Sequence, residues 1–432
     1  MTPFKPSATD QQLDELLRRS GPMNLPRAYE VMAAHGLQGL VLGDPLNVYH
    51  MLGYWPQLAS TKTGQPPSSF VLLSRDPSVG PGFVTTQFVY YYTWADARIE
   101  WCSQVWLYGE AGDDGRESPV PVPPLCVDRH VVPVTDVERR RRAALDAIPL
   151  ARQQLHDAGA ALVRAMRELG LWHGKVAADH AVIAAVCEHH QRPGSVVAAD
   201  NIVREIRLVK SPLEIQLMSR AAQANVSAVH AVAQAVRAGA SYSELRGLFA
   251  VETARRGNRE VFLTVDRVSS ELADERIREG QVLFIDGVSH FRRYHGDYAR
   301  TVFVGQPPAS AQRAVAAAVA GWHAVRDCLR PGLKYSDIVR IGTEAVKQAG
   351  YDGQIGFGPH SVGLMHTDEP GIDAQGFLRK ADLVLQPNMI LSVDCPVMDT
   401  GIGGSAHFED LMLITANGAT PLHAIDNPVI QL

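Results

Sequence analysis

Two neighbouring stretches of sequence decide the fold. They are Val282-Leu-Phe-Ile-Asp286-Gly287 and Gly296-Asp297-Tyr-Ala-Arg300-Thr301-Val-Phe-Val-Gly305. Each part is an apolar run typical of a buried strand, and each carries one aspartate. A hairpin across the gap would bring Asp286 and Asp297 close together. Two close carboxylates repel each other unless a proton or a cation lies between them, so a metal ion is the simplest partner. The alternative is that Asp286 ends a strand in a turn and that Asp297 pairs with Arg300.

A pattern beside this hairpin is repeated in the chain. Gly239-Ala-Ser-Tyr-Ser-Glu-Leu245 returns with similar residues as Gly332-Leu-Lys-Tyr-Ser-Asp-Ile338. Each copy follows an Ala-rich stretch of helical character, precedes a shorter helix that ends in glycine, and leads into strand-rich sequence. We predict an internal duplication, with two similar halves facing each other across a pseudo-two-fold axis. The seam between such halves is a natural place for a site.

The second half carries further candidate ligands. The segment Gly356-Phe-Gly-Pro-His360-Ser-Val-Gly-Leu-Met-His366-Thr-Asp368-Glu369-Pro370 places two histidines in a glycine-rich stretch with acids beside them, which favours a ligand or acid–base role. Asp394 and Glu409 each interrupt an apolar run, where a charge is costly unless it is paired or binds a metal. The predicted metal ligands are Asp286, Asp297, His360, Asp394 and Glu409. One nitrogen among oxygens suits one or two ions of Mn²⁺, Fe²⁺, Co²⁺ or Zn²⁺.

The rest of the 432 residues is interpreted as a leader and a second domain. We expect a leader over residues 1–22, an α/β domain over residues 23–205 and a catalytic domain over residues 206–432. The expected early elements are a helix over 26–35, strands over 39–42 and 68–74, a turn over 44–47 and a loop over 119–124. Ser211-Pro-Leu-Glu214 forms a capping box that should open a helix running to about Arg237.

Composition excludes several classes of function. The net charge of −5 argues against a dedicated nucleic-acid binder, and the run Arg139–Arg142 is interpreted as a solvated helix face. No apolar stretch is long enough for a membrane span, and the first residues lack the apolar core of a secretion signal. The five cysteines form no CxxC pair, which fits a reducing cytoplasm. Tyr90–Tyr92 and Trp94 are expected in a core or an interface.

These motifs resemble the creatinase/prolidase superfamily, the pita-bread metallopeptidases, in order and spacing. The N-terminal half supports the resemblance through Asp44-Pro-Leu-Asn-Val-Tyr-His-Met-Leu-Gly53 and Arg207-Leu-Val-Lys-Ser-Pro-Leu-Glu214. The resemblance implies an α/β (α+β) protein with an N-terminal creatinase-like domain and a C-terminal pita-bread domain. It implies that Asp286 and Asp297 ligate one ion, that Asp297 and Glu409 bridge to a second, and that His360 and Asp394 complete the shell. It also implies a homodimer.

The chain departs from the family pattern at three places. Asp394 stands where the family has a glutamate, and Thr367 stands where it has a second histidine. The nearest imidazole is His366, our candidate for the general acid–base, with Asp368 or Glu369 as the alternatives. The stretch 265–276 lacks the substrate-facing histidine of the prolidases.

Three functions remain open at this point. The first is a metal-dependent hydrolase of an amide or peptide bond in a small molecule or short peptide, similar to Xaa-Pro dipeptidases and aminopeptidases P. The second is a non-peptidase enzyme on the same fold, a C–N hydrolase or a lyase that acts on a small polar metabolite. The third is a binding module with a vestigial site, against which the retained set of ligands argues.

Overall fold

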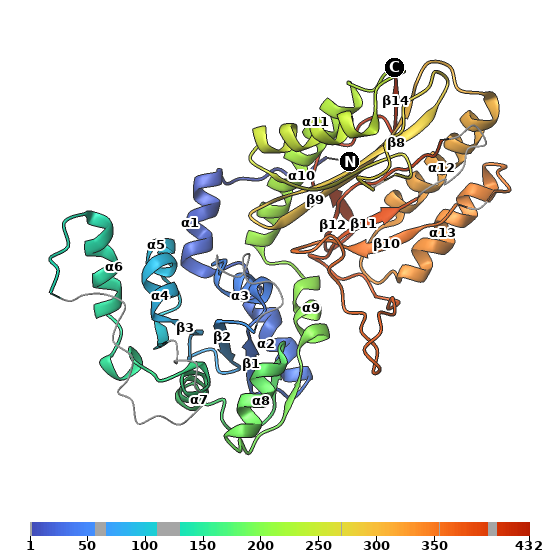
Figure 1. Cartoon of the computed structure of the whole chain (residues 1–432). Coiled ribbons are helices and arrows are strands. Elements are labelled where there is room, and N and C mark those ends of the chain that lie inside the picture. The colour runs from blue at the N-terminus through green and yellow to red at the C-terminus, as the bar shows by residue number, and fades with distance from the viewer. Residues whose placement is uncertain (1, 57–65, 110–129, 269, 354, 396–403) are drawn as a thin grey trace. The chain divides into compact units, whose positions relative to one another are not determined.

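The computed structural model describes residues 2–56, 66–109, 130–268, 270–353, 355–395 and 404–432 (Figure 1). These residues form two compact units, one of residues 9–206 and the other of residues 207–432 together with the first eight. Among the described helices, none is long and apolar enough to cross a membrane. The predicted loop over 119–124 lies outside the described residues.

The unit of residues 9–206 is built on a six-stranded mixed sheet with the strand order β4-β3-β2-β1-β5-β6. Its strands are β1 (Gly39–Leu42), β2 (Ser69–Ser74), β3 (Gly82–Thr86), β4 (Gln104–Tyr108), β5 (Val176–Ala178) and β6 (Val196–Ala198). Its helices are α1 (Asp10–Ser20), α2 (Leu25–Ala34), α3 (Pro45–Leu52), α4 (Gln87–Val89), α5 (Ala95–Ala97), α6 (Asp136–Asp146), α7 (Ala158–Glu168) and α8 (Ala181–His189), and α9 (Asp200–Leu208) leads out of the unit. A π-helix covers Tyr90–Trp94 and a 3₁₀ turn covers Leu150–Arg152.

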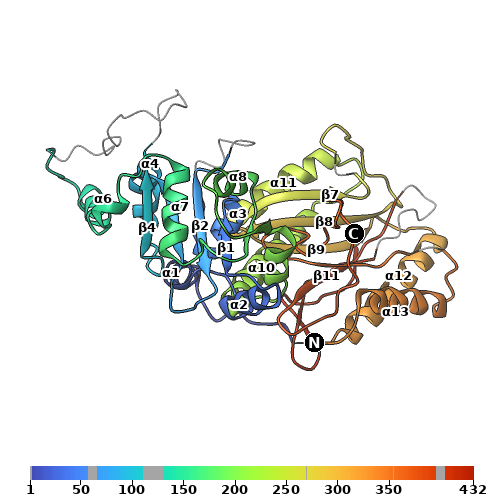
Figure 2. The ribbon, with the colours of Figure 1, turned by 90° about the horizontal axis from the view of Figure 1, so that it is seen from below.

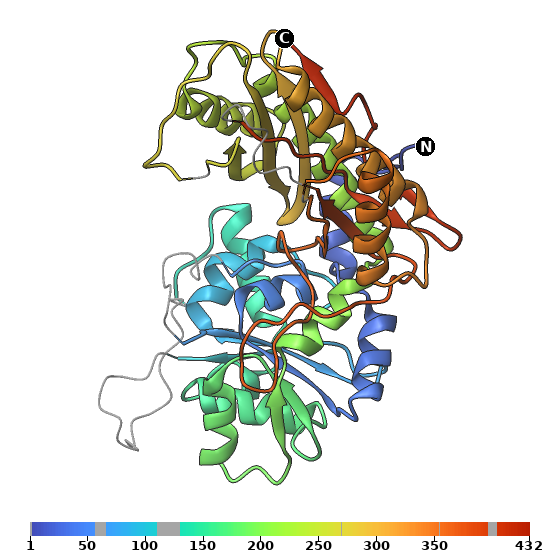
Figure 3. The same ribbon diagram turned by 90° about the vertical axis from the view of Figure 1, so that its right-hand side faces the viewer.

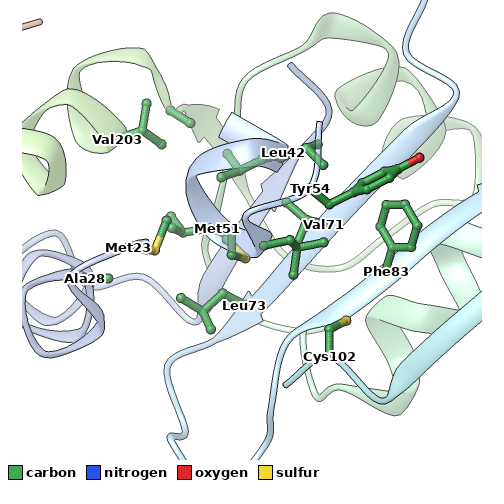
Figure 4. Close-up of a cluster of buried hydrophobic side chains, with 14 of the residues drawn as sticks. Met23, Ala28, Leu42, Met51, Tyr54, Val71, Leu73, Phe83, Cys102 and Val203 are labelled. Carbon is green, nitrogen blue, oxygen red and sulfur yellow. The ribbon is translucent and has the colours of Figure 1, made fainter. Parts of the chain in front are cut away.

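One local prediction in this unit needs correction. The predicted turn over 44–47 is the start of α3, because the Asp44 carboxylate accepts the backbone N–H of Leu46 at 2.8 Å and thereby caps the helix. Residues 10–20 of the polar leader form α1, which buries Leu13 and Leu17. Figure 4 shows part of the core of this unit, in which the rings of Tyr54 and Phe83 lie next to each other.

Two of the aromatic residues predicted for a core or an interface lie in the same core, whereas Tyr92 is 52% exposed. Tyr90 and Trp94 are 5% and 4% exposed, and the Trp94 ring stacks on Phe83. Arg141, from the expected solvated helix face, lies on α6 and pairs with Asp96. These side chains are therefore used for packing within the unit.

The unit of residues 207–432 contains two four-stranded sheets with the orders β14-β9-β8-β7 and β10-β11-β12-β13. Its elements are α10 (Pro212–Ala233), α11 (Tyr242–Arg255), β7 (Arg259–Val265), β8 (Val282–Phe291), β9 (Tyr294–Phe303), α12 (Ala309–Cys328), α13 (Tyr335–Gln348), β10 (Gly358–Ser361), β11 (Ile390–Asp394), β12 (Met412–Ile414), β13 (Ala419–Pro421) and β14 (Val429–Gln431). Figure 2 shows β7, β8 and β9 side by side, and Figure 3 shows the helix pairs, coloured yellow-green and orange, on the outside of the strands. The predicted hairpin is confirmed as β8–β9.

The internal duplication is visible in matching hydrogen bonds of the two halves. Ser243 donates its backbone N–H and its hydroxyl to Asp274 at 2.9 and 2.8 Å, and Ser336 donates the same two groups to Asp382 at 2.9 Å each. Both turns are preceded by a glycine at positive φ, 87° at Gly239 and 89° at Gly332. The order helix–turn–helix–strands thus recurs with the same helix-capping contacts, as the sequence repeat predicts.

Two glycines next to the predicted aspartate ligands let a helix approach the first sheet closely. A Cβ added at Gly296 would lie 2.8 Å from the backbone oxygen of Ala221 in α10, and one at Gly287 would lie 2.6 Å from Val229. Side chains alternate between the two faces of a strand, so Asp286 and Asp297 point to the face opposite α10. The glycines therefore fix which face carries the carboxylates.

Candidate metal centre

The first two predicted ligands share one face of the β8–β9 hairpin. Asp286 lies opposite Ala299, and Asp297 lies opposite Val288, so the two aspartates are diagonal neighbours in the ladder. Diagonal pairs lie within side-chain reach of each other. The alternative pairing of Asp297 with Arg300 is not formed, because the Arg300 guanidinium binds Asp410 at 2.7 Å and Asp426 at 2.9 Å.

The second half contributes a matching diagonal pair. In the β10–β11 ladder His360 lies opposite Ser392, and Asp394 lies opposite Gly358. His360 and Asp394 therefore occupy the same kind of positions as Asp286 and Asp297 do in the first half. The duplicated architecture presents two donors from each half to a shared space.

Glu409 is held in this space by the first-half sheet. Its backbone forms an isolated antiparallel bridge with Ala299 of β9, and Arg300 donates a hydrogen bond to its carbonyl oxygen at 2.9 Å. The Glu409 side chain is 1% exposed. A residue of the second half is thus attached to β9, the strand that carries Asp297.

The donor atoms converge on two sides of the same pair of carboxylates. On one side, His360 Nε2 lies 3.3 Å from Glu409 Oε1, 3.7 Å from Asp297 Oδ2 and 3.9 Å from Asp394 Oδ2. On the other side, the Nε2 atom of His407 lies 3.5 Å from Asp394 Oδ1 and 3.6 Å from Glu409 Oε2. Asp394 and Glu409 therefore present one oxygen to each imidazole.

These separations fit bound metal ions. At a metal–ligand distance of about 2.1 Å, adjacent ligand atoms of one ion lie roughly 3.0–3.5 Å apart and opposite ones about 4.2 Å apart. The structure has three groups of possible metal ligands, and within each group the ligand atoms lie within 4.8 Å of one another. The groups are Asp297, His360 and His366; Asp286, His407 and Glu409; and His360, Asp394 and Glu409. Both Asp297 oxygens and Asp286 Oδ1 are buried and accept no hydrogen bond from any described residue. A bound cation would stabilise buried carboxylate oxygens that accept no hydrogen bond.

The electrostatics of the cluster reflect the same crowding of charge. Burial and the neighbouring Glu409 raise the pKa of Asp286 to about 7 and hold the pKa of Asp297 well above its usual range. Burial also acts to raise the pKa of Glu409, but hydrogen bonds to His360 and His407 hold it well below its usual range. Burial opposes charging of His360, yet Glu409 and Asp394 raise its pKa to about 9. Without a cation, protons balance this charge.

The predicted acid–base residues are placed very differently from one another. His366 Nε2 lies 3.2 Å from Asp297 Oδ2, its ring lies 4.9 Å from that of His360, and its side chain is 34% exposed. Asp368 instead accepts hydrogen bonds from Arg207 Nε at 2.9 Å and from the N–H of Leu364 at 3.1 Å. His366 thus lies at the cluster and can be reached from solvent.

Glu369, the other alternative, is also occupied by the fold. It accepts hydrogen bonds from the Tyr335 hydroxyl and from the N–H of Ser361, both at 2.9 Å. Thr367, at the position of the family histidine, is exposed. Among the candidates of this segment, the geometry favours His366.

His407 is the residue that our sequence reasoning missed. It is 4% exposed and belongs to one of the donor groups, although it was not among the predicted ligands. A signal was present in the sequence, because His407 and Glu409 are two residues apart in an apolar run. Residues with this spacing point to the same face of an extended segment.

Comparisons with known proteins agree with this architecture. Residues 216–416 match metallopeptidase family M24. The Xaa-Pro dipeptidase of Bacillus anthracis superposes with a TM-score of 0.65 at 17% identity, covering 94% of this chain and 99% of that chain. The predicted fold, with its C-terminal pita-bread domain, is confirmed.

Two curated relatives match part of the chain. The probable dipeptidase PepE of Mycobacterium tuberculosis is 25% identical over 244 residues, which cover 54% of this chain and 63% of the relative. Ectoine hydrolase of Halomonas elongata is 26% identical over 116 residues, 27% of this chain and 29% of that protein. The alignment therefore spans less than two thirds of the length of either relative.

Proposed function

We propose that the chain is a metal-dependent hydrolase that cleaves an amide or peptide bond in a small substrate, similar to Xaa-Pro dipeptidases. One observation carries the proposal: side chains of both duplicated halves converge on one space, in which buried carboxylate oxygens accept no hydrogen bond from described residues. Asp286, Asp297, His360, Asp394 and Glu409 would hold one or two divalent ions. The names of PepE and of the Bacillus anthracis structure support peptide-bond cleavage.

Bound divalent ions would supply activation of water and polarisation of a carbonyl group. The residues of the chain perform the remaining tasks. His366 lies beside Asp297 and is partly exposed, so it can pass a proton between the substrate and solvent. Phe262, whose ring lies edge-on to His366 at 5.4 Å, forms an apolar wall next to that imidazole and restricts how a substrate approaches it.

A second candidate is a C–N hydrolase or lyase acting on a small polar metabolite. It is favoured by the absence of histidine over 265–276, by the exposed Thr367 at the family's acid–base position and by the match to ectoine hydrolase. These differences concern substrate handling and leave the cluster of metal ligands intact. We further propose a cytoplasmic homodimer, whose subunit number light scattering would measure.

A substrate panel tests the proposal and separates the two candidates. The purified chain is stripped with a chelator, reloaded separately with Mn²⁺, Fe²⁺, Co²⁺ or Zn²⁺, and assayed on Xaa-Pro dipeptides, on other dipeptides and on ectoine. Metal-dependent release of free amino acids from dipeptides supports the first candidate. Turnover of ectoine alone supports the second, and no turnover with any metal rejects both. The matched control is Glu409→Gln, which keeps the shape of the side chain but removes its charge.

A further inference from the structure

His407 is held rigidly against the first-half sheet. Its backbone N–H donates to Thr301 Oγ1 at 3.1 Å, and the Thr301 hydroxyl donates to its carbonyl oxygen at 3.1 Å. Its ring lies edge-on to Phe284 with the centroids 5.4 Å apart. These contacts fix the direction of the imidazole, which is 4% exposed.

The fixed imidazole points at the same two carboxylates as His360, but at their other oxygens. Asp394 turns Oδ2 toward His360 and Oδ1 toward His407, and Glu409 turns Oε1 toward His360 and Oε2 toward His407. Asp297 completes the group on the His360 side, and Asp286 completes the group on the His407 side. Each side therefore has an imidazole, one aspartate of its own and one oxygen from each shared carboxylate. His366, which also belongs to the group of Asp297 and His360, is assigned to acid–base chemistry above and is not counted as a ligand.

We infer that His407 is a metal ligand and supplies the second nitrogen of a two-ion centre in which each ion has one imidazole. The inference rests on the metal dependence proposed above and changes its donor set from one nitrogen to two. Its distances of 3.5 and 3.6 Å to carboxylate oxygens are those of neighbouring ligands around one ion. The competing role is that of an imidazolium that pairs with Asp394 and Glu409 and binds no metal.

The second imidazole has a consequence for the choice of metal. Imidazole suits zinc, iron and nickel, whereas carboxylate-rich sites suit manganese and magnesium. With a nitrogen on each side, both positions should prefer Zn²⁺ or Fe²⁺ over Mn²⁺. A variant without the imidazole should lose part of this preference at one position only.

X-ray absorption of the zinc-loaded 432-residue chain tests the inference directly. The expected result is two bound ions with about one imidazole each. In His407→Ala, half that average is expected when enough zinc is present to fill both sites. The number of ions and their dissociation constants come from elemental analysis and calorimetry with zinc alone. We expect the weaker zinc site of His407→Ala to lose at least 10²-fold in affinity, because even the loss of an outer partner costs 10–100-fold.

Two further variants separate a ligand from a charge partner. His407→Arg keeps a positive charge but cannot ligate, so it should lose zinc as His407→Ala does; unchanged zinc binding in His407→Arg would overturn the inference. His290→Asn is the matched control, because it removes an imidazole of β8 that belongs to none of the donor groups. If the alanine variant fails to fold, the imidazole count of the wild type still decides. Bound ions that share a single imidazole overturn this inference alone, whereas absence of any bound ion overturns the proposed function as well.

Discussion

Asp297→Asn should make the metal-free protein more stable while destroying its response to metal. Asp297 is fully buried, and neither of its oxygens accepts a hydrogen bond from a described residue. A buried polar group left unsatisfied costs about 1–3 kcal/mol. The neutral amide of the same shape needs neither a buried charge nor the uptake of a proton on folding. We therefore expect the free energy of unfolding of the chelator-treated variant to rise by about 1–2 kcal/mol.

The paired buried carboxylate of Asp410 is the control. Its Oδ1 binds the fully buried Arg300 guanidinium at 2.7 Å, so Asp410→Asn removes one of the two carboxylates that pair with Arg300 and should destabilise the protein by about 1–3 kcal/mol. Thermal unfolding is measured in chelator and again with Zn²⁺ at about 100 times its dissociation constant, which stabilises a binding-competent protein by about 2.7 kcal/mol. A destabilised metal-free Asp297→Asn that keeps the zinc shift would refute the reasoning.

Three other expectations are open to direct measurement. Asp394→Glu should change metal content or turnover, because ligand distances tolerate only about 0.2 Å; identical values in both proteins would show that Asp394 is not a ligand. His366→Ala should lower turnover by ~10²–10⁴ with metal content preserved, and unchanged turnover would remove His366 from the mechanism. Burial and the nearby His295 lower the pKa of His290 to about 4, below the ~6.5 of an unfolded chain. Because the unfolded chain takes up this proton at a higher pH than the folded protein, the folded protein loses stability as the pH falls from about 6.5 toward 4. His290→Asn should therefore reduce the loss of stability between about pH 7 and pH 5 by about 1–2 kcal/mol in urea titrations.

Local signals made most of the M24 fold predictable. The capping box at Ser211–Glu214 is present as expected, although α10 ends at Ala233 and not near Arg237. The β8–β9 hairpin follows from two apolar runs joined by a short connection. The repeated turns could be predicted because the same few residue types form the same hydrogen bonds in both halves. Each of these features depends on residues that are close in the chain.

What the sequence could not supply was the register between distant segments. His360 and Asp394 share a face only because Gly358 lies opposite Asp394 in the β10–β11 ladder, and nothing near either residue specifies that pairing. In the same way, the hydrogen bonds that occupy Asp368 and Glu369 come from Arg207 and Tyr335, far away in the chain. The sequence alone therefore left His366, Asp368 and Glu369 as acid–base candidates, and the structure favours His366.

The segment that carries His407 and Glu409 shows how the two halves combine into one centre. Each half alone offers a diagonal pair of donors, Asp286 with Asp297 and His360 with Asp394. The crossing segment belongs to the second half, but it is fastened to β9 through the Ala299 bridge and the Thr301 hydroxyl. A backbone anchored on both sides of Phe408 leaves its neighbours little freedom to move. The carboxylate and the imidazole are therefore fixed between the two pairs before any ion binds, which lowers the entropy cost of assembling the centre.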